Sequence, residues 1–285
     1  MDDSGEQEGT VTRLGPLEFY NLYRNMTVDL EDGRRIFGVD IHEYRNAKDY
    51  YKGTNDISED HDVTAGMSVA WADLSRKIRK HGTKIRKGTY SIWLPIPKPG
   101  ADPEIQIEEV AVMAQFVGVF SGKGSPTAIR QTLKLTAAFG LCDATAASMN
   151  SYCQAFIGLD CSGFVGNYLK HMGHGSIGPS TPAKSFAPEV NRLSKLSDIQ
   201  AGCVICWKNV GHVAVIDRVL SSTGSDVECK VVESTGSSLI PGDVHTDGMN
   251  HTTYHVKSVD SAKVFKVKRG IGGSGLNSVY IAKVL

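Results

Sequence analysis

The clearest hydrophobic pattern in the chain follows Cys161, where apolar residues recur at the spacing of one helical face and Gly173 stands where such a helix would end. This pattern predicts an amphipathic helix whose first turn carries Cys161, outside the buried stripe. The apolar positions are Phe164, Val165, Tyr168, Leu169 and Met172.

The same reasoning predicts two further helices. One covers residues 67–80, where Val69, Ala70, Leu74 and Ile78 share a face. The other begins at Ser125-Pro126, because proline is tolerated at the first helical position, and ends at Gly140.

Strand-like segments occupy both halves of the chain. Residues 27–44 are typical of two strands joined by a turn at Asp32-Gly33. The segment "TYSIWLPIPKPG" (89–100) predicts a strand ended by prolines. In residues 104–120, apolar and polar side chains alternate as they do in a strand. Residues 201–220 predict two strands with a turn near 208–211. The second of them, after His212, is apolar enough to be buried on both faces.

Glycine and serine at 121–126, "SGKGSP", mark the best domain boundary. We therefore predict a smaller β-rich module at 1–124, of unknown role, and an α+β domain at 125–285. In the second domain, the Cys161 helix would pack against an antiparallel sheet that carries His212.

Composition narrows the function classes. Lys+Arg and Asp+Glu both total 31 and the pI is about 7.1, so no overall charge favours nucleic acid or anionic membranes. The longest apolar stretch, 110–120, is too short to span a bilayer, and the polar first ten residues do not resemble a secretory signal. Six irregularly spaced cysteines suggest reduced thiols rather than a disulfide scaffold.

Cys161 has the sequence context of a nucleophile. Free amides and the positive end of a helix dipole stabilise a thiolate, and the thiolate is the reactive form. Gly163 would leave room for a substrate backbone. The candidate base is His212, which directly precedes a buried strand. Glu233 lies near the end of the next strand (226–235) and could accept a hydrogen bond from the other imidazole nitrogen.

At these residues the sequence resembles the NlpC-type cysteine peptidases, papain-like hydrolases of bacterial cell-wall peptides. "LDCSGFV" is similar to the family's nucleophile signature, "GHVAVI" to its histidine signature, and "SDIQAGCVICW" to the stretch between them. There are three departures. Glu233 stands where the family usually has His, Asn or Gln, Gly202-Cys203 replaces Gly-Asp, and the loop before the nucleophile is short.

The resemblance implies a reaction in which an acyl group is transferred to Cys161, with His212 acting first as the acid and then as the base. It also implies the substrate: the amide bond between D-glutamate and a diamino acid in peptidoglycan stem peptides. The oxyanion hole would combine the Cys161 amide with Tyr152 or Gln154, and Asp160 and Ser162 are further substrate-contact candidates. Two alternatives remain: a related thiol acyltransferase or deamidase acting on lipid or protein, and an inactive wall-binding module. No metal or cofactor is implied. The site of action is open, because a wall hydrolase can be exported, injected or released by lysis.

Other groupings carry weaker hypotheses. A basic run could contact an anionic polymer or could simply be a solvated helix face, and it lacks the aromatic residues that would suggest nucleic acid. Cys203 and Cys206 would point to opposite faces of a strand as inert thiols. His171 and His174 end a helix, and His245, His251 and His255 with Asp243 and Asp247 lie in a predicted loop without zinc spacing. The basic run comprises Arg76, Lys77, Arg79, Lys80, Lys84, Arg86 and Lys87.

Overall fold

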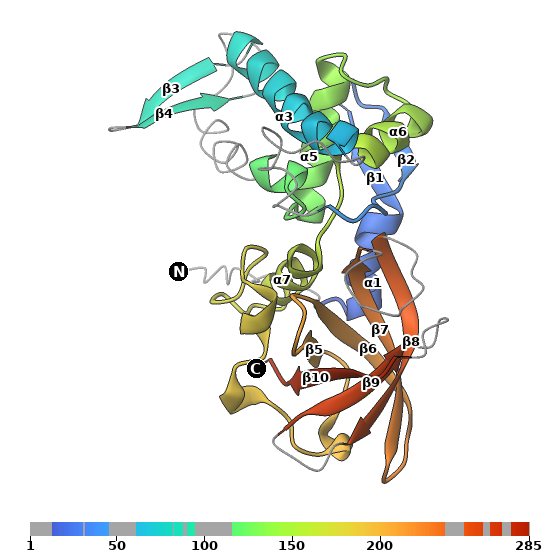
Figure 1. The fold of residues 1–285 in the computed structure, drawn as a ribbon. Coiled ribbons are helices and arrows are strands. Elements are labelled where there is room, and N and C mark those ends of the chain that lie inside the picture. Colours follow the sequence, from blue (N-terminus) through green and yellow to red (C-terminus); the bar gives the residue numbers. More distant parts are fainter. Residues whose placement is uncertain are drawn as a thin grey trace, which may run out of the picture.

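The protein is described here from a computed structural model, which combines helices with antiparallel sheets in an α+β fold (Figure 1). The structure describes residues 13–30, 32–45, 61–81, 83–87, 90–94, 116–236, 248–258, 263–269 and 275–284. Within these residues, no helix is both long and apolar enough to cross a membrane.

The C-terminal half forms a closed six-stranded barrel in which every neighbouring pair is antiparallel. Around the barrel the order is β10-β5-β6-β7-β8-β9. The strands are β5 (Val204–Trp207), β6 (Val213–Ser222), β7 (Asp226–Thr235), β8 (Gly248–Ser258), β9 (Phe265–Arg269) and β10 (Asn277–Ala282). The sequence predicted β5, β6 and β7 correctly, but not the closure into a barrel.

Side chains alternate between the inside and the outside of the barrel, as the pleat of a strand requires. In β7, Cys229 and Val231 belong to one buried cluster with Tyr254 of β8, while Val232 belongs to a second cluster with the helices. The first cluster draws only on barrel strands and their flanks, so it fills the interior. The apolar start of β6 is buried on both sides because it separates the two clusters.

Helix α7 (Cys161–His171) packs its apolar stripe beside helix α1 (Pro16–Arg24) and against β6 and β7 (Figure 1). Phe164 and Tyr168 contact Phe19 of α1 with ring centroids 6.1 and 5.7 Å apart. The helix ends at a turn in which Gly173 has φ of 92°, a conformation that glycine adopts without strain. The position and length of this helix are confirmed, but its amphipathic character is not, because every residue from 161 to 169 is buried. Three 3₁₀ turns then lead to β5: η1 (Ala183–Phe186), η2 (Glu189–Asn191) and η3 (Leu196–Asp198).

Helices α3 (His61–His81), α5 (Pro126–Ala138) and α6 (Ala146–Phe156) lie away from the barrel (Figure 1). The side-chain oxygen of Ser125 caps α5 by accepting a hydrogen bond from Ala128, as the Ser-Pro start predicted. On α3, Met67, Ala70, Leu74 and Ile78 are buried, whereas Val69, which we had placed on the same face, is exposed.

Two hairpins complete the described elements: β1 (Met26–Asp29) with β2 (Arg35–Val39), and β3 (Thr83–Lys87) with β4 (Tyr90–Leu94). The first hairpin turns at Asp32-Gly33, as predicted, with φ of 82° at the glycine. The prediction of a strand up to residue 120 is wrong where it can be checked, because residues 116–120 are helical. Short buried apolar runs fit helix and strand equally well, so periodicity alone could not decide.

One hydrophobic core spans the boundary expected near residue 124. Phe19 and Tyr23 from before it share a buried cluster with Phe164 and Val165 from after it. The described part of residues 1–124 is also mixed rather than β-rich, since α1, α3 and residues 116–120 are helical.

Candidate active site

Cys161 is the first residue of α7, and its thiol donates a hydrogen bond to the carbonyl oxygen of Gly211, 3.5 Å away. The helix start thus lies against the turn between β5 and β6. Only 4% of Cys161 is exposed, so our expectation that it lies outside the buried face is wrong. The first turn of α7 is enclosed by neighbouring loops as well as by the barrel, which a helical periodicity cannot reveal.

The two residues that flank Cys161 are engaged with Lys123. Asp160 is the N-cap of α7 and accepts a hydrogen bond from the amide of Gly163. The Lys123 ammonium pairs with the other carboxylate oxygen of Asp160 and also donates to the Ser162 hydroxyl. Burial raises the pKa of Asp160, and Lys123 opposes that rise. The side chains of Asp160 and Ser162 therefore anchor the first turn of α7. Their contact with a substrate stays a prediction.

Gly163 is required by close packing inside the protein. A Cβ atom at this position would lie 1.9 Å from the carbonyl oxygen of Gly122. That same carbonyl accepts a hydrogen bond from the amide of Asp160, at 3.0 Å. Our expectation that Gly163 leaves room for a substrate backbone is therefore wrong, because the 121–124 loop fills that space.

The residue before Asp160 connects the helix start to the barrel. The amide of Leu159 donates to Glu43, and its carbonyl accepts from the amide of Arg45 and from the hydroxyl of Ser234 at 2.6 Å. Ser234 follows Glu233 directly on β7. These bonds fix the position of Cys161 relative to the strand that carries Glu233.

His212 immediately precedes β6, and its ring is fully buried at one end of the barrel interior. Its Nε2 lies 2.8 Å from Oε2 of Glu233. Trp207, at the end of β5, packs edge-on against the imidazole with ring centroids 4.5 Å apart. The pairing of His212 with a third group on the adjacent strand, which the sequence suggested, is present.

Glu233 is itself fully buried and has three side-chain partners. Besides His212, the hydroxyl of Tyr254 donates to Oε2 at 2.8 Å, and the guanidinium of Arg269 donates to Oε1. Burial alone would raise the pKa of Glu233, but His212, Arg269 and Tyr254 outweigh it and hold the pKa below its usual range. The carboxylate is therefore ionised at neutral pH.

The thiol and the carboxylate act on His212 together. Burial alone would lower the pKa of the imidazole, but the nearby Cys161 side chain and the Glu233 carboxylate outweigh it and raise the pKa to about 9. Because Nε2 is engaged by Glu233, Nδ1 is the nitrogen left for the thiol. Nδ1 is buried, and no described atom meets the geometry of a hydrogen bond to it. Such contacts are often loose in a free enzyme and tighten when substrate binds.

Tyr152 and Gln154 do not join this group. Tyr152 is on α6, where its ring packs against that of Phe156 with the ring centroids 4.9 Å apart. Burial strongly raises the pKa of the Tyr152 hydroxyl. Gln154 is exposed, and its backbone carbonyl accepts from Arg45. In the described structure, neither side chain forms a hydrogen bond, ion pair or ring contact with Cys161, His212 or Glu233. The Cys161 amide remains available as an oxyanion donor, and the second donor has no residue assigned.

Sequence reasoning missed Trp207, Tyr254 and Arg269. The alternation along β9 gave a usable signal, because Arg269 shares the face of Phe265 and Val267, both buried. A cation on an apolar face needs a buried anion, and Glu233, on the face of Cys229 and Val231, is that anion. The partnership depends on strand order, which the sequence did not show.

The remaining cysteines and histidines have structural surroundings. All six cysteines are free, and Cys203 and Cys206 lie in different buried clusters, as predicted for opposite faces. His171 accepts from the amide of Leu14 at 3.2 Å, and His251 contacts Asp217 at 3.2 Å. In the part of the chain that is described, no group of His, Cys, Asp and Glu could hold a metal. His245, Asp243 and Asp247 lie outside that part.

The basic run is divided between α3 and β3. Arg76 is exposed and pairs with Asp73 at 2.6 Å, one helical turn away, and Lys77 is exposed nearby. Arg79 and Lys80 continue α3, and Lys84, Arg86 and Lys87 are on β3, but their side chains lie outside what is described. Contact with an anionic polymer stays a prediction.

Comparisons with known proteins do not assign the chain to a family. No family model matches the chain, no curated protein matches it, and no solved structure matches it.

Proposed function

We propose that this protein is a cysteine hydrolase that cleaves an amide bond in peptidoglycan stem peptides, of the D-glutamyl–diamino acid type, with Cys161, His212 and Glu233 as its catalytic group. The observation that carries the proposal is the buried His212–Glu233 pair beside a cysteine at a helix start. A papain-like arrangement, with a nucleophile helix against an antiparallel barrel, is part of the same proposal.

In the proposed reaction, the Cys161 thiolate attacks the carbonyl carbon and forms a carbon–sulfur bond, while the backbone amide of Cys161 stabilises the oxyanion. The His212 imidazolium gives its proton to the leaving amine as the carbon–nitrogen bond breaks. Water, deprotonated by His212, then attacks the thioester and releases the acid and the free thiol. Glu233 keeps the imidazole oriented and stabilises its charge throughout.

The substrate class rests on the resemblance of residues 152–234 to the cell-wall peptidases. The direct test is mass spectrometry of muropeptides after digestion of purified peptidoglycan. New amine and carboxyl ends should appear with the wild type and not with Cys161→Ala. Equal product from both proteins would overturn the proposal.

The burial of the thiol favours a second candidate, an inactive wall-binding module. Cys161 is 4% exposed and His212 is not exposed at all, so a substrate reaches them only if the site opens. Iodoacetamide labelling near neutral pH separates the two. If the site is catalytically active, iodoacetamide should label Cys161 faster than the partly buried Cys142. If the protein is an inactive module, Cys142 should be labelled first.

If intact wall is unaffected but Cys161 labels rapidly, the related acyltransferase or deamidase activity becomes the better assignment. Ammonia release from protein glutamine, or acyl transfer from a lipid, would then identify it.

A further inference from the structure

Glu233 can hold the His212 ring in two ways, which differ in the position of one proton. A neutral imidazole carries a single proton, on Nδ1 or on Nε2, and the hydrogen bond made by one nitrogen decides which. An ionised carboxylate only accepts hydrogen bonds. Opposite Oε2 of an ionised Glu233, the proton is therefore on Nε2 and Nδ1 keeps its lone pair. A protonated carboxyl group would donate to Nε2 instead, and the ring would then carry its own proton on Nδ1.

Only the first arrangement lets His212 act on Cys161. The thiol can give its proton only to a nitrogen with a free lone pair, and Nε2 is engaged by Glu233. If Nδ1 already carries the proton of the neutral ring, the thiol has no acceptor on the imidazole. The charge of Glu233 therefore decides whether the ring can serve as a base.

Burial works against that charge. Glu233 is fully buried, and the side chains that fill the barrel interior beside it are apolar. A carboxylate in such surroundings takes up a proton unless a cation is paired with it. The nearest proton is on His212. Its transfer from Nε2 of the imidazolium to Oε2 of Glu233 would convert the ion pair into a neutral pair and leave the ring proton on Nδ1.

Arg269 supplies the charge that opposes this transfer. Its guanidinium is buried and pairs with Oε1 of Glu233, the carboxylate oxygen that does not contact His212. A guanidinium keeps its proton in proteins, so this charge is permanent. Oε2 stays available to accept from Nε2 of His212 and from the hydroxyl of Tyr254, each at 2.8 Å.

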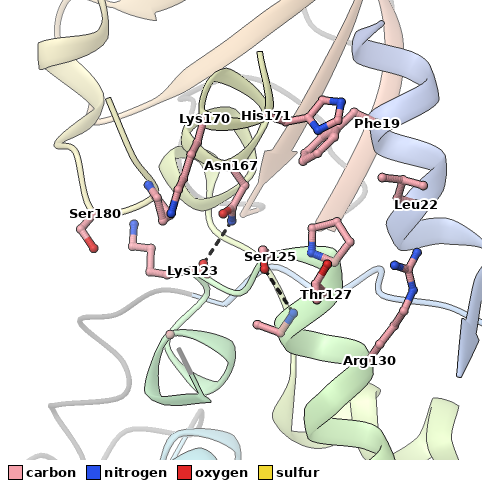
Figure 2. A pocket seen from close by; sticks show the side chains of 14 residues that line it. Phe19, Leu22, Lys123, Ser125, Thr127, Arg130, Asn167, Lys170, His171 and Ser180 are labelled. Atoms are coloured by element: carbon pink, nitrogen blue, oxygen red, sulfur yellow. Dashed lines mark hydrogen bonds between the residues drawn. The ribbon is translucent and has the colours of Figure 1, made fainter. Parts of the chain in front are cut away.

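The structure offers Glu233 little other positive charge. In the described part of the chain, its ion-pair partners are His212 and Arg269. Three further cations gather instead around a cavity of about 640 Å³ between α1, α5 and α7, to which no barrel strand contributes a residue (Figure 2). These three are Lys123, Arg130 and Lys170.

We propose that Arg269 is a positioning residue for His212: by keeping Glu233 ionised, it fixes the neutral ring with its proton on Nε2 and leaves Nδ1 free to take the thiol proton. The catalytic consequence rests on the proposed function, whereas the position of the proton is a property of the free protein.

Nitrogen-15 NMR of the histidine side chains tests the proton positions without a substrate, and His212→Gln identifies the signals of His212. In the wild type, both ring nitrogens should be protonated at neutral pH. Above the pKa of about 9, Nδ1 should lose its proton and Nε2 should keep it. Arg269→Gln keeps a polar side chain but removes the charge. At neutral pH, it should show a protonated Nδ1 and an unprotonated Nε2.

Three variants separate the charge of Arg269 from other effects, and all should keep the wild-type proton positions. Lys268→Gln is the matched control, because it removes an exposed cation from the same strand. Arg269→Lys retains a cation at the site. Tyr254→Phe removes a hydrogen bond to Glu233 but no charge.

Rates on purified peptidoglycan test the catalytic consequence. Arg269→Gln should lose about 10⁴-fold in kcat with little change in KM, which is the loss expected when a catalytic histidine is held in the wrong tautomer. Arg269→Lys should recover most of this loss. Thermal unfolding checks that each variant is folded. If Arg269→Gln is not, Arg269→Lys carries the test: wild-type proton positions support the role of the cation, and reversed positions contradict it.

A wild-type ring that keeps its proton on Nδ1 above pH 9 would overturn the proposal, and so would wild-type proton positions in a folded Arg269→Gln. Reversed positions in Tyr254→Phe would also overturn it, because the hydroxyl rather than the charge would then be the cause. If the wild type shows the expected proton positions but leaves peptidoglycan intact, the proposed hydrolysis fails while the role of Arg269 stands.

Discussion

Arg269 and Glu233 form a buried ion pair across the barrel interior, although they belong to β9 and β7, which are separated by β8. Tyr254 lies between them, paired with Arg269 in the strand register and bonded to Glu233 through its hydroxyl. The orientation of His212 thus depends on three strands of the barrel besides the one it precedes.

Arg269→Met should strongly destabilise the protein, because it leaves Glu233 buried without its cation. Breaking a buried pair on one side costs about 3–5 kcal/mol in the free energy of unfolding, which urea denaturation would measure. Lys268→Met, an exposed neighbour on the same strand, is the control and should have little effect. Adding Glu233→Gln to Arg269→Met should restore part of the loss. If the double variant is no more stable than Arg269→Met, the pair is not the cause.

His212→Gln should abolish hydrolysis, with a loss of at least about 10³-fold in kcat, because the variant can neither form the ion pair with the thiol nor transfer a proton. His251→Gln serves as the matched control, since His251 is paired with Asp217 and lies outside the candidate site. Rates on purified peptidoglycan provide the measurement. Substantial turnover by the His212 variant would exclude it as the acid and base.

The pH dependence of kcat/KM should show an alkaline limb near pH 9, where the His212 imidazolium loses its proton. Since Glu233 is one of the groups that raise this pKa, Glu233→Gln should move the limb towards the ordinary histidine value of 6.5. A pH–rate profile of both proteins measures the shift. An identical alkaline limb in the two would show that Glu233 does not act on His212.

The same interaction contributes to stability with a defined sign. The folded-state pKa of His212 is raised, so its contribution is fully present below about pH 6.5 and is lost as the pH rises through 9. The free energy of unfolding of the wild type, compared with that of His212→Gln, should therefore fall across this window. A difference that grows with pH would contradict the assignment.

Gly163→Ala should displace the start of α7, because the new Cβ would meet the backbone carbonyl of Gly122. We expect a loss of more than about 1 kcal/mol in stability and a larger proportional loss of activity, since Cys161 lies in the same turn. Gly175→Ala is the control, because open space surrounds that position. Thermal unfolding and peptidoglycan digestion measure the two effects, and wild-type behaviour of Gly163→Ala would refute the tight contact.

Local patterns predicted the pieces of this site better than its surroundings. The helix after Cys161, the strand after His212 and the strand ending near Glu233 each follow from periodicity within a dozen residues. The first turn of α7 is held instead by the 43–45 and 121–124 segments, which are distant in sequence. Tyr152 was misplaced for the same reason, because its position in the chain, shortly before the nucleophile, does not bring it near the thiol.

The core shared by Phe19, Tyr23 and Phe164 bears on how the chain can be divided. A fragment beginning at residue 125 would lose the aromatic side chains that cover one flank of α7, the Lys123 partner of Asp160 and the carbonyl of Glu43 that receives the Leu159 amide. In such a fragment, water would reach that flank of α7, and the first turn of the helix would lose its anchoring hydrogen bonds. The segment that precedes the helix is thus a part of its scaffold, and excision at this point would not yield an autonomous unit.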